Sequence, residues 1–131
     1  MTGASSGIGI ETTLQLLRWS AMRSPALKIV MAVRDVQKGA KVREELSEIL
    51  GRELAQKSLP ADAFKRRMGD AMNNISIEAL DLCDMKSVNL FIGRMNSKSG
   101  KTSVLVNNAG AVTVGAGEDK GWLGWRRGIN R

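Results

Sequence analysis

The chain has 131 residues, of which 43% are hydrophobic and 25% charged, a balance that suits one globular domain with a modest core. It contains no histidine and a single cysteine, so a structural zinc site and an internal disulfide are both excluded. No apolar run is long enough to span a bilayer. We expect the cysteine, Cys83, to pack as a small apolar side chain after a strand.

The net charge of +7 comes from 20 Lys and Arg against 13 Asp and Glu. Such an excess suits an acidic partner such as nucleic acid or a membrane surface. The positive residues are scattered, however, with local clusters only at 65–67 and 126–127. We therefore interpret the charge as a solvated surface and expect no nucleic-acid partner, with a basic nucleic-acid-binding protein as the alternative.

The first feature along the chain is a glycine-rich turn, Thr2-Gly3-Ala4-Ser5-Ser6-Gly7-Ile8-Gly9. The spacing Gly-x-x-x-Gly-x-Gly lets the backbone turn tightly and approach a pyrophosphate, while the next helix points its free N–H groups at the anion. The turn therefore predicts a dinucleotide site. Its spacing differs from the standard Gly-x-Gly-x-x-Gly, and an ordinary Gly/Ser turn is the alternative.

Two helices and a strand should follow this turn. The first helix begins at Ile8 and ends near residues 24–25, and its apolar residues recur at helical spacing: Ile10, Leu14 and Leu17. Residues 27–33 form a nearly unbroken apolar run, typical of a parallel strand covered on both faces. Asp35 can cap the next helix. The buried stripe of that helix comprises Val42, Leu46, Ile49 and Leu50.

The second half of the chain contains a longer connection, two further strands and a helix. Residues 51–74 read as a surface insertion away from the chemistry, with a short helix over 61–68. The third strand covers 75–80 and the fourth 103–106. Between them Asp84 caps a helix. Its expected buried stripe comprises Val88, Phe91, Ile92 and Met95.

Four motifs in this order resemble those of the short-chain dehydrogenase/reductase family. The glycine turn is followed by Ala32-Val33-Arg34-Asp35, Leu80-Asp81-Leu82 and Val106-Asn107-Asn108-Ala109-Gly110. The resemblance covers nearly the whole chain and is nearest to the retinol-dehydrogenase-like and protochlorophyllide-reductase-like branches, which share the Arg-Asp pair. It implies an α/β fold, a Rossmann-type doubly wound parallel sheet, with 1–131 as the N-terminal part of an NAD(P)-binding domain.

The resemblance also implies a nicotinamide cofactor. Its pyrophosphate would lie on the turn, at Gly3, Ser5, Ser6, Gly7, Ile8 and Gly9. Arg34, at the end of the second strand, can bind a 2′-phosphate through a bidentate contact, which favours NADP. NAD stays open as the alternative, because Arg34 could simply pair with Asp35, and because Ser6 stands where NADP enzymes of the family often have a basic residue.

Two further motifs would contact the cofactor in the family's manner. The Asp81 carboxylate would accept from the adenine amine, and the backbone N–H of Leu82 would reach the ring. Asn108 would contact the cofactor, the backbone at Ala109 would pass under the ribose, and Gly110 would make room for it. On spacing alone these are a helix-leading Asp and an ordinary strand-end turn.

Asn130 matches the catalytic Asn of the family, which helps to hold a water in the proton relay; a terminal Asn without function is the alternative. The family's remaining catalytic groups are a Ser and a Tyr-x-x-x-Lys pair, and this chain has no tyrosine. We therefore expect the chain to be an inactive fragment of a longer protein.

The fragment should also lack most of the family's apolar first strand, because only Met1 precedes Thr2. The second and fourth strands would then present two facing, unpaired edges. We expect a cytoplasmic chain, with organellar targeting and homo-oligomerisation of a longer parent left open.

In function, the parent would transfer hydride between NADP(H) and a carbonyl, an alcohol or an activated double bond of a small molecule. The alternative from another class is a non-catalytic nucleotide-binding or dimerising remnant.

Overall fold

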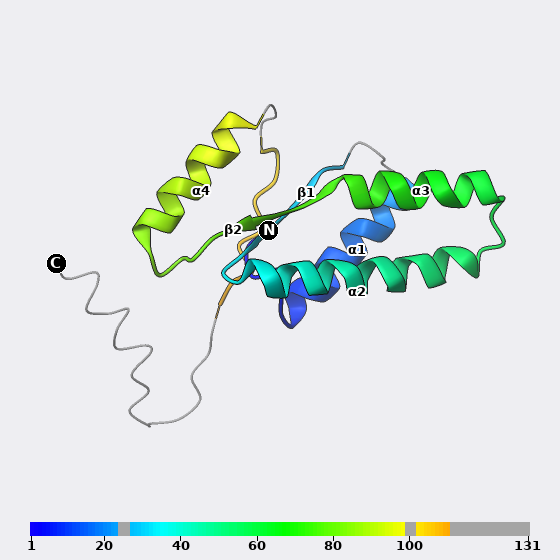
Figure 1. Ribbon diagram of the computed structural model, residues 1–131, viewed down its shortest axis with the longest axis horizontal. Coiled ribbons are helices and arrows are strands. Elements are labelled where there is room, and N and C mark those ends of the chain that lie inside the picture. The colour runs from blue at the N-terminus through cyan, green and yellow to red at the C-terminus, as the bar shows by residue number, and fades with distance from the viewer. Residues whose placement is uncertain (24–26, 99–101, 111–131) are drawn as a thin grey trace, which may run out of the picture.

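The computed structural model describes residues 1–23, 27–98 and 102–110, and these form an α/β unit with a parallel sheet (Figure 1). Its elements in chain order are α1 (Ile8–Met22), β1 (Ile29–Val33), α2 (Val36–Ala55), α3 (Ala61–Asn73), β2 (Ile75–Ala79) and α4 (Met85–Ser97). The predicted α/β class is confirmed. The arrangement is that of the N-terminal part of a Rossmann-type fold.

The two strands pair in parallel, with Ile29 opposite Ile75 at one end and Val33 opposite Ala79 at the other. Both strands were predicted, and each is shorter than its apolar run. On the other side of β1, Thr2 forms a parallel bridge with Ala32. The Ala32 N–H donates to the Met1 carbonyl at 2.9 Å, and the Gly3 N–H donates to the Ala32 carbonyl at 3.2 Å.

Residues 1–3 therefore occupy the place of a central strand. Thr2 also reaches the opposite side, where its N–H donates to the carbonyl of Val106 at 3.0 Å. The expectation of two fully unpaired facing edges is wrong at these positions, because three residues suffice to bridge β1 to the segment that contains Val106.

The predicted fourth strand at 103–106 is not formed. Val104 and Leu105 are 76% and 64% exposed, and the contact with Thr2 ties this segment down at Val106. A strand needs a ladder of successive backbone hydrogen bonds, and among the described residues the backbone of 103–106 forms one such bond, from the Thr2 N–H to the Val106 carbonyl.

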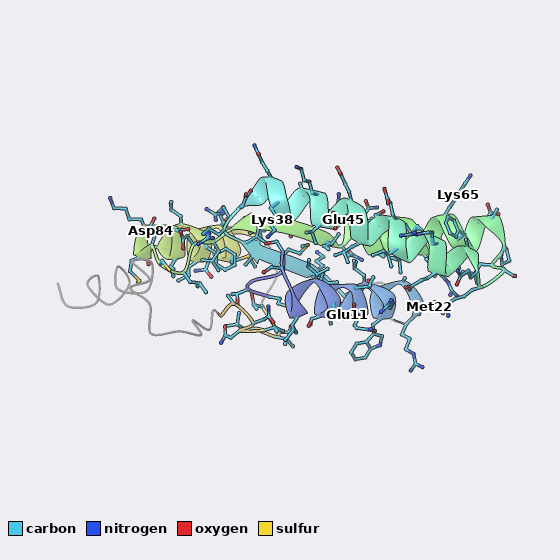
Figure 2. All side chains as sticks on the ribbon, turned by 90° about the horizontal axis from the view of Figure 1, so that it is seen from below. Glu11, Met22, Lys38, Glu45, Lys65 and Asp84 are labelled. Carbon is cyan, nitrogen blue, oxygen red and sulfur yellow. The ribbon has the colours of Figure 1, made fainter. Side chains whose placement is uncertain are left out.

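The core lies where α1, α2 and α3 meet the sheet, and most of the predicted stripes are confirmed. Its largest fully buried apolar side chains are Leu17, Met31, Leu46, Leu50, Leu54 and Val33. The polar faces of the helices point outwards: Glu45 on α2 and Lys65 on α3 lie on one side of the molecule and Glu11 on α1 lies on the other (Figure 2).

The segment 51–74 is more structured than expected. Residues up to Ala55 continue α2, and α3 extends to Asn73, five residues beyond the predicted end. It is not confined to the surface, because Leu54 and Ala71 are buried and Phe64 packs against the core. That this segment is an insertion relative to the family stays a prediction.

Helix α4 differs most from expectation. None of its residues is buried, and Ile92 of the predicted stripe is 48% exposed. The expected buried stripe is wrong, because among the described elements α4 packs against β2 alone. Cys83 is exposed, not buried as expected, because it lies in the turn before α4. Within the described ranges, no helix is both long and apolar enough to cross a membrane.

Candidate functional site

The glycine turn connects residues 1–3 to α1, and at two of its glycines the neighbouring backbone packs too closely to leave room for a side chain. A Cβ on Gly3, where φ is +64°, would lie 2.8 Å from the Cα of Ala109. A Cβ on Gly9 would lie 2.1 Å from the carbonyl oxygen of Gly3. Contacts this short are forbidden, so both positions require glycine.

Gly7 has a different role in the turn. Its φ of +49° favours glycine, yet a Cβ there would meet nothing within 4 Å. The turn is therefore open to solvent at Gly7 and packed at Gly3 and Gly9. A Cβ at Gly7 would project into the space from which a ligand could approach the start of α1.

The start of α1 has unsatisfied backbone donors. Gly7 is the N-cap residue and no side chain caps the helix. The N–H groups of Gly9 and Ile10 bond to the carbonyls of Ser6 and Gly7. Within the described chain, the preceding N–H groups, those of Ser5, Ser6, Gly7 and Ile8, donate no well-aligned hydrogen bond. Free N–H groups at a helix N-terminus attract an anion, so the predicted pyrophosphate fits this turn.

The turn is clamped to the segment 108–109 by Thr2, which is 7% exposed. Its hydroxyl accepts from the N–H groups of Asn108 and Ala109, at 3.1 and 3.0 Å. In return, the Asn108 side-chain amide donates to the carbonyls of Thr2 and Gly3, at 3.1 and 3.2 Å. Sequence reasoning gave Thr2 no role of its own, although its place before the first glycine of the turn was a signal.

The side-chain nitrogen of Asn108 thus braces the turn. A contact between Asn108 and the cofactor stays a prediction. Because the side-chain nitrogen already donates to the turn, the amide oxygen would make that contact. Gly110 is exposed, and a Cβ there would meet nothing within 4 Å. Both Ala109 and Gly110 are open to solvent beside the turn.

The carboxyl end of β1 presents Arg34, which is exposed and follows Val33, the last residue of the strand. Asp35 caps α2, since its carboxylate accepts from the Lys38 N–H at 3.0 Å. The predicted cap is confirmed. The Asp35 carboxylate is thereby held at the helix start, and the structure shows no ion pair between it and Arg34.

The carboxyl end of β2 lies beside that of β1, because the Leu80 N–H donates to the Val33 carbonyl at 2.8 Å. Asp81 follows in a tight turn, in which its carboxylate accepts from the Cys83 N–H at 2.9 Å. Its own N–H donates to the hydroxyl of Ser87 at 2.9 Å. Leu82 is 48% exposed. Ser87 was not predicted, and its place in the first turn of a helix gave no specific signal.

An ion cluster around a buried carboxylate lies just before this turn. Glu78, 9% exposed, accepts from Arg94 Nε at 2.9 Å and from the ammonium group of Lys98. Hydrogen bonds from Lys98 and then from Arg94 hold the pKa of the Glu78 carboxyl below its ordinary value, against the opposing effect of burial. The sequence did not indicate this cluster, because its members are 16 and 20 residues apart.

The structure thus gathers the predicted cofactor residues at the carboxyl ends of β1 and β2 and around the turn. Direct hydrogen bonds join the turn to Asn108 and Ala109, and β1 joins the turn to Arg34 and the Asp81 loop. In open α/β sheets this edge is where ligands bind. Asn130 lies outside the described residues, as does the Asp-Lys-Gly-Trp segment at 119–122.

Comparison with known proteins shows relatives along most of the chain. It is 30% identical to retinol dehydrogenase 12 of Mus musculus over 112 residues, 86% of this chain and 27% of the relative. It is 32% identical to retinol dehydrogenase 14 of Homo sapiens over 110 residues, 84% and 29% respectively. It is 34% identical to the dehydrogenase/reductase SDR family member FEY of Arabidopsis thaliana over 115 residues, 88% and 25%.

The chain therefore spans little more than a quarter of the length of these relatives. No protein-family profile matches it. No solved structure matches it either.

Proposed function

Because this chain is related to the short-chain dehydrogenase/reductases of the retinol-dehydrogenase-like kind, we propose that it is the cofactor-binding portion of an NADP-preferring member. The whole protein would transfer hydride between NADP(H) and a carbonyl, an alcohol or an activated double bond. The observation that carries this proposal is the uncapped glycine turn clamped to Asn108 and Ala109. Such a turn binds the pyrophosphate of a dinucleotide through backbone N–H groups.

Each part of the site would have a distinct task. The N–H groups from Ser5 to Ile8 would hold the pyrophosphate. Arg34 would bind the 2′-phosphate, which its exposed guanidinium at the strand end permits. Asp81 and Leu82 would recognise the adenine. The bound cofactor would supply or accept the hydride.

Proton transfer needs groups that this chain does not supply. Its relatives' family uses a tyrosine as proton donor, and the chain contains none. Asn130 would order a water in the relay without replacing that donor. The 131-residue chain should therefore bind the cofactor and not turn over a substrate.

Calorimetric titration of the 131-residue chain with NADPH and with NADH tests this function. We expect saturable binding of NADPH, tighter than that of NADH. Absence of binding to both nucleotides would refute the proposal, and preference for NADH would refute the NADP assignment alone. Salt-dependent binding to DNA in preference to NADPH would favour the nucleic-acid alternative.

A further inference from the structure

Glu78 is a charged side chain on β2 that is 9% exposed, and its charged partners come from the last turn of α4 and from its C-cap residue. A carboxylate is rarely buried without compensating charges. Here the compensation comes from Arg94 and Lys98, in the last turn of the helix and just beyond it. We name these three residues the Glu78 cluster.

Apolar packing contributes little to the position of α4. No residue of the helix is fully buried, and Met85 and Leu90 are 68% and 63% exposed. Val88, Phe91 and Met95 are half-buried, but they do not belong to the core cluster. Among the described elements it contacts β2 alone. The polar contacts of the Glu78 cluster are therefore the main constraint on where α4 lies relative to the sheet.

The helix in turn holds the loop that precedes it at two points. Arg94 donates through its second nitrogen to the carbonyl of Ala79, the last residue of β2, at 2.5 Å. Ser87, in the first turn of α4, accepts from the N–H of Asp81. The connection between Ala79 and α4 is thus anchored to one rigid helix at its start and within its turn.

From these contacts we infer that the Glu78 cluster positions the residues that recognise adenine. The cluster holds α4 against β2, and α4 in turn fixes where Asp81 and Leu82 lie at the edge of the sheet. The inference rests on the proposed cofactor function. Glu78 lies three residues before Asp81 and is a positioning residue, since its own carboxylate is occupied by Arg94 and Lys98.

The test compares NADPH with its hypoxanthine analogue, which carries a carbonyl in place of the adenine amine. The unmodified chain should bind NADPH about tenfold more tightly, because the analogue lacks the donor for the Asp81 carboxylate. Asp81→Asn should reduce this ratio to about one. Glu78→Gln and Arg94→Met should reduce it several-fold, although neither residue meets the base.

The ratio of the two Kd values, measured on one sample, does not depend on the folded fraction of that sample. It therefore separates positioning from general destabilisation. Lys98→Met provides a milder variant, because its side chain is 50% exposed at the helix end. Glu53→Gln is the matched control: it breaks a comparable ion pair, with Arg18, that joins α1 to α2. Its ratio should equal that of the unmodified chain.

The outcomes are separable. If the unmodified chain binds neither ligand, the proposed function fails. If it binds NADPH and the analogue equally, or if all three cluster variants keep the ratio of the unmodified chain, the positioning role is refuted while the cofactor function stands. If Glu53→Gln lowers the ratio as much as Glu78→Gln does, the effect is not specific to the cluster and the inference is equally refuted.

Discussion

Thr2 and Asn108 hold each other through four hydrogen bonds that involve their side chains and the adjacent backbone of Gly3 and Ala109. The hydroxyl of Thr2 accepts two backbone N–H groups, and the amide of Asn108 donates to two carbonyls. Residues more than 100 positions apart in the sequence are thereby joined on one side of the candidate cofactor site.

Thr2→Val should destabilise the chain, because two N–H groups near a nearly buried side chain lose their acceptor. The expected cost is about 1–3 kcal/mol for the Asn108 N–H and less for the Ala109 N–H, because Ala109 is exposed and water can replace the lost acceptor. Urea denaturation followed by circular dichroism measures it. Thr12→Val is the control, since the Thr12 hydroxyl only donates to the Ile8 carbonyl on the exposed side of α1. Equal stability of the two variants would contradict the clamp.

Gly7→Val should abolish NADPH binding and leave the fold largely intact, because its Cβ meets no protein atom but occupies the approach to the uncapped helix start. At φ +49° and ψ −129° the backbone of Gly7 lies in a region that side chains rarely adopt, so Val adds a local strain of about 1–3 kcal/mol. Gly9→Ala should instead disrupt the turn itself, since the new Cβ would collide with the Gly3 carbonyl. Titration and thermal melts of both variants distinguish the two effects.

Gly69→Ala is the matched control for these glycine variants. Gly69 lies on α3, and a Cβ there meets nothing within 4 Å. The NADPH titration should match that of the unmodified chain. The melting temperature should be unchanged or slightly higher, because Ala replaces Gly inside a helix. If Gly7→Val binds NADPH with the affinity of the unmodified chain, the glycine turn is not part of the cofactor site.

Arg34→Ala should narrow the preference for NADPH over NADH. A lost charge-assisted contact with the 2′-phosphate costs about 1.5–3 kcal/mol, whereas NADH has no such group. Arg23→Ala, at an exposed position after α1, removes the same charge away from the sheet edge and should leave the ratio unchanged. If Arg34→Ala also leaves the ratio of the Kd values for NADH and NADPH unchanged, the assignment of Arg34 to the 2′-phosphate is refuted.

The sequence correctly predicted helix caps and buried helix faces, which depend on residues that are close along the chain. Asp35 and Asp84 both cap helices through their carboxylates, as expected from their places before apolar periodic segments. Leu17, Leu46 and Leu50 are buried as their spacing indicated. These features follow from local geometry and from helical periodicity, which a single sequence contains.

The sequence failed where a feature depends on the partner in space. The residues of α4 have helical spacing, but burial also requires a second surface, and only β2 contacts the helix among the described elements. Val104 and Leu105 are apolar without forming a strand for the same reason. The roles of Thr2 and Glu78 were missed because their hydrogen bonds join segments distant in sequence.

Acid should release α4 from the sheet. The Glu78 carboxyl has a lowered pKa in the folded chain, so its ion pairs stabilise fully above its ordinary pKa of about 4.3 and are lost as the pH falls through the lowered value. Hydrogen exchange of the α4 amides should therefore accelerate below about pH 4 relative to its intrinsic rate. Glu78→Gln should show faster exchange already at neutral pH. If the α4 amides exchange at the same rate in Glu78→Gln and in the unmodified chain at neutral pH, this account is contradicted.

The most direct test of the cofactor site is amide chemical-shift mapping of the ¹⁵N-labelled chain during titration with NADPH. The account predicts that the largest shifts occur at the four uncapped N–H groups, those of Ser5, Ser6, Gly7 and Ile8, with smaller shifts at Asp81 and Leu82. Saturable binding that leaves these four amides unshifted would contradict the claim that the glycine turn holds the dinucleotide.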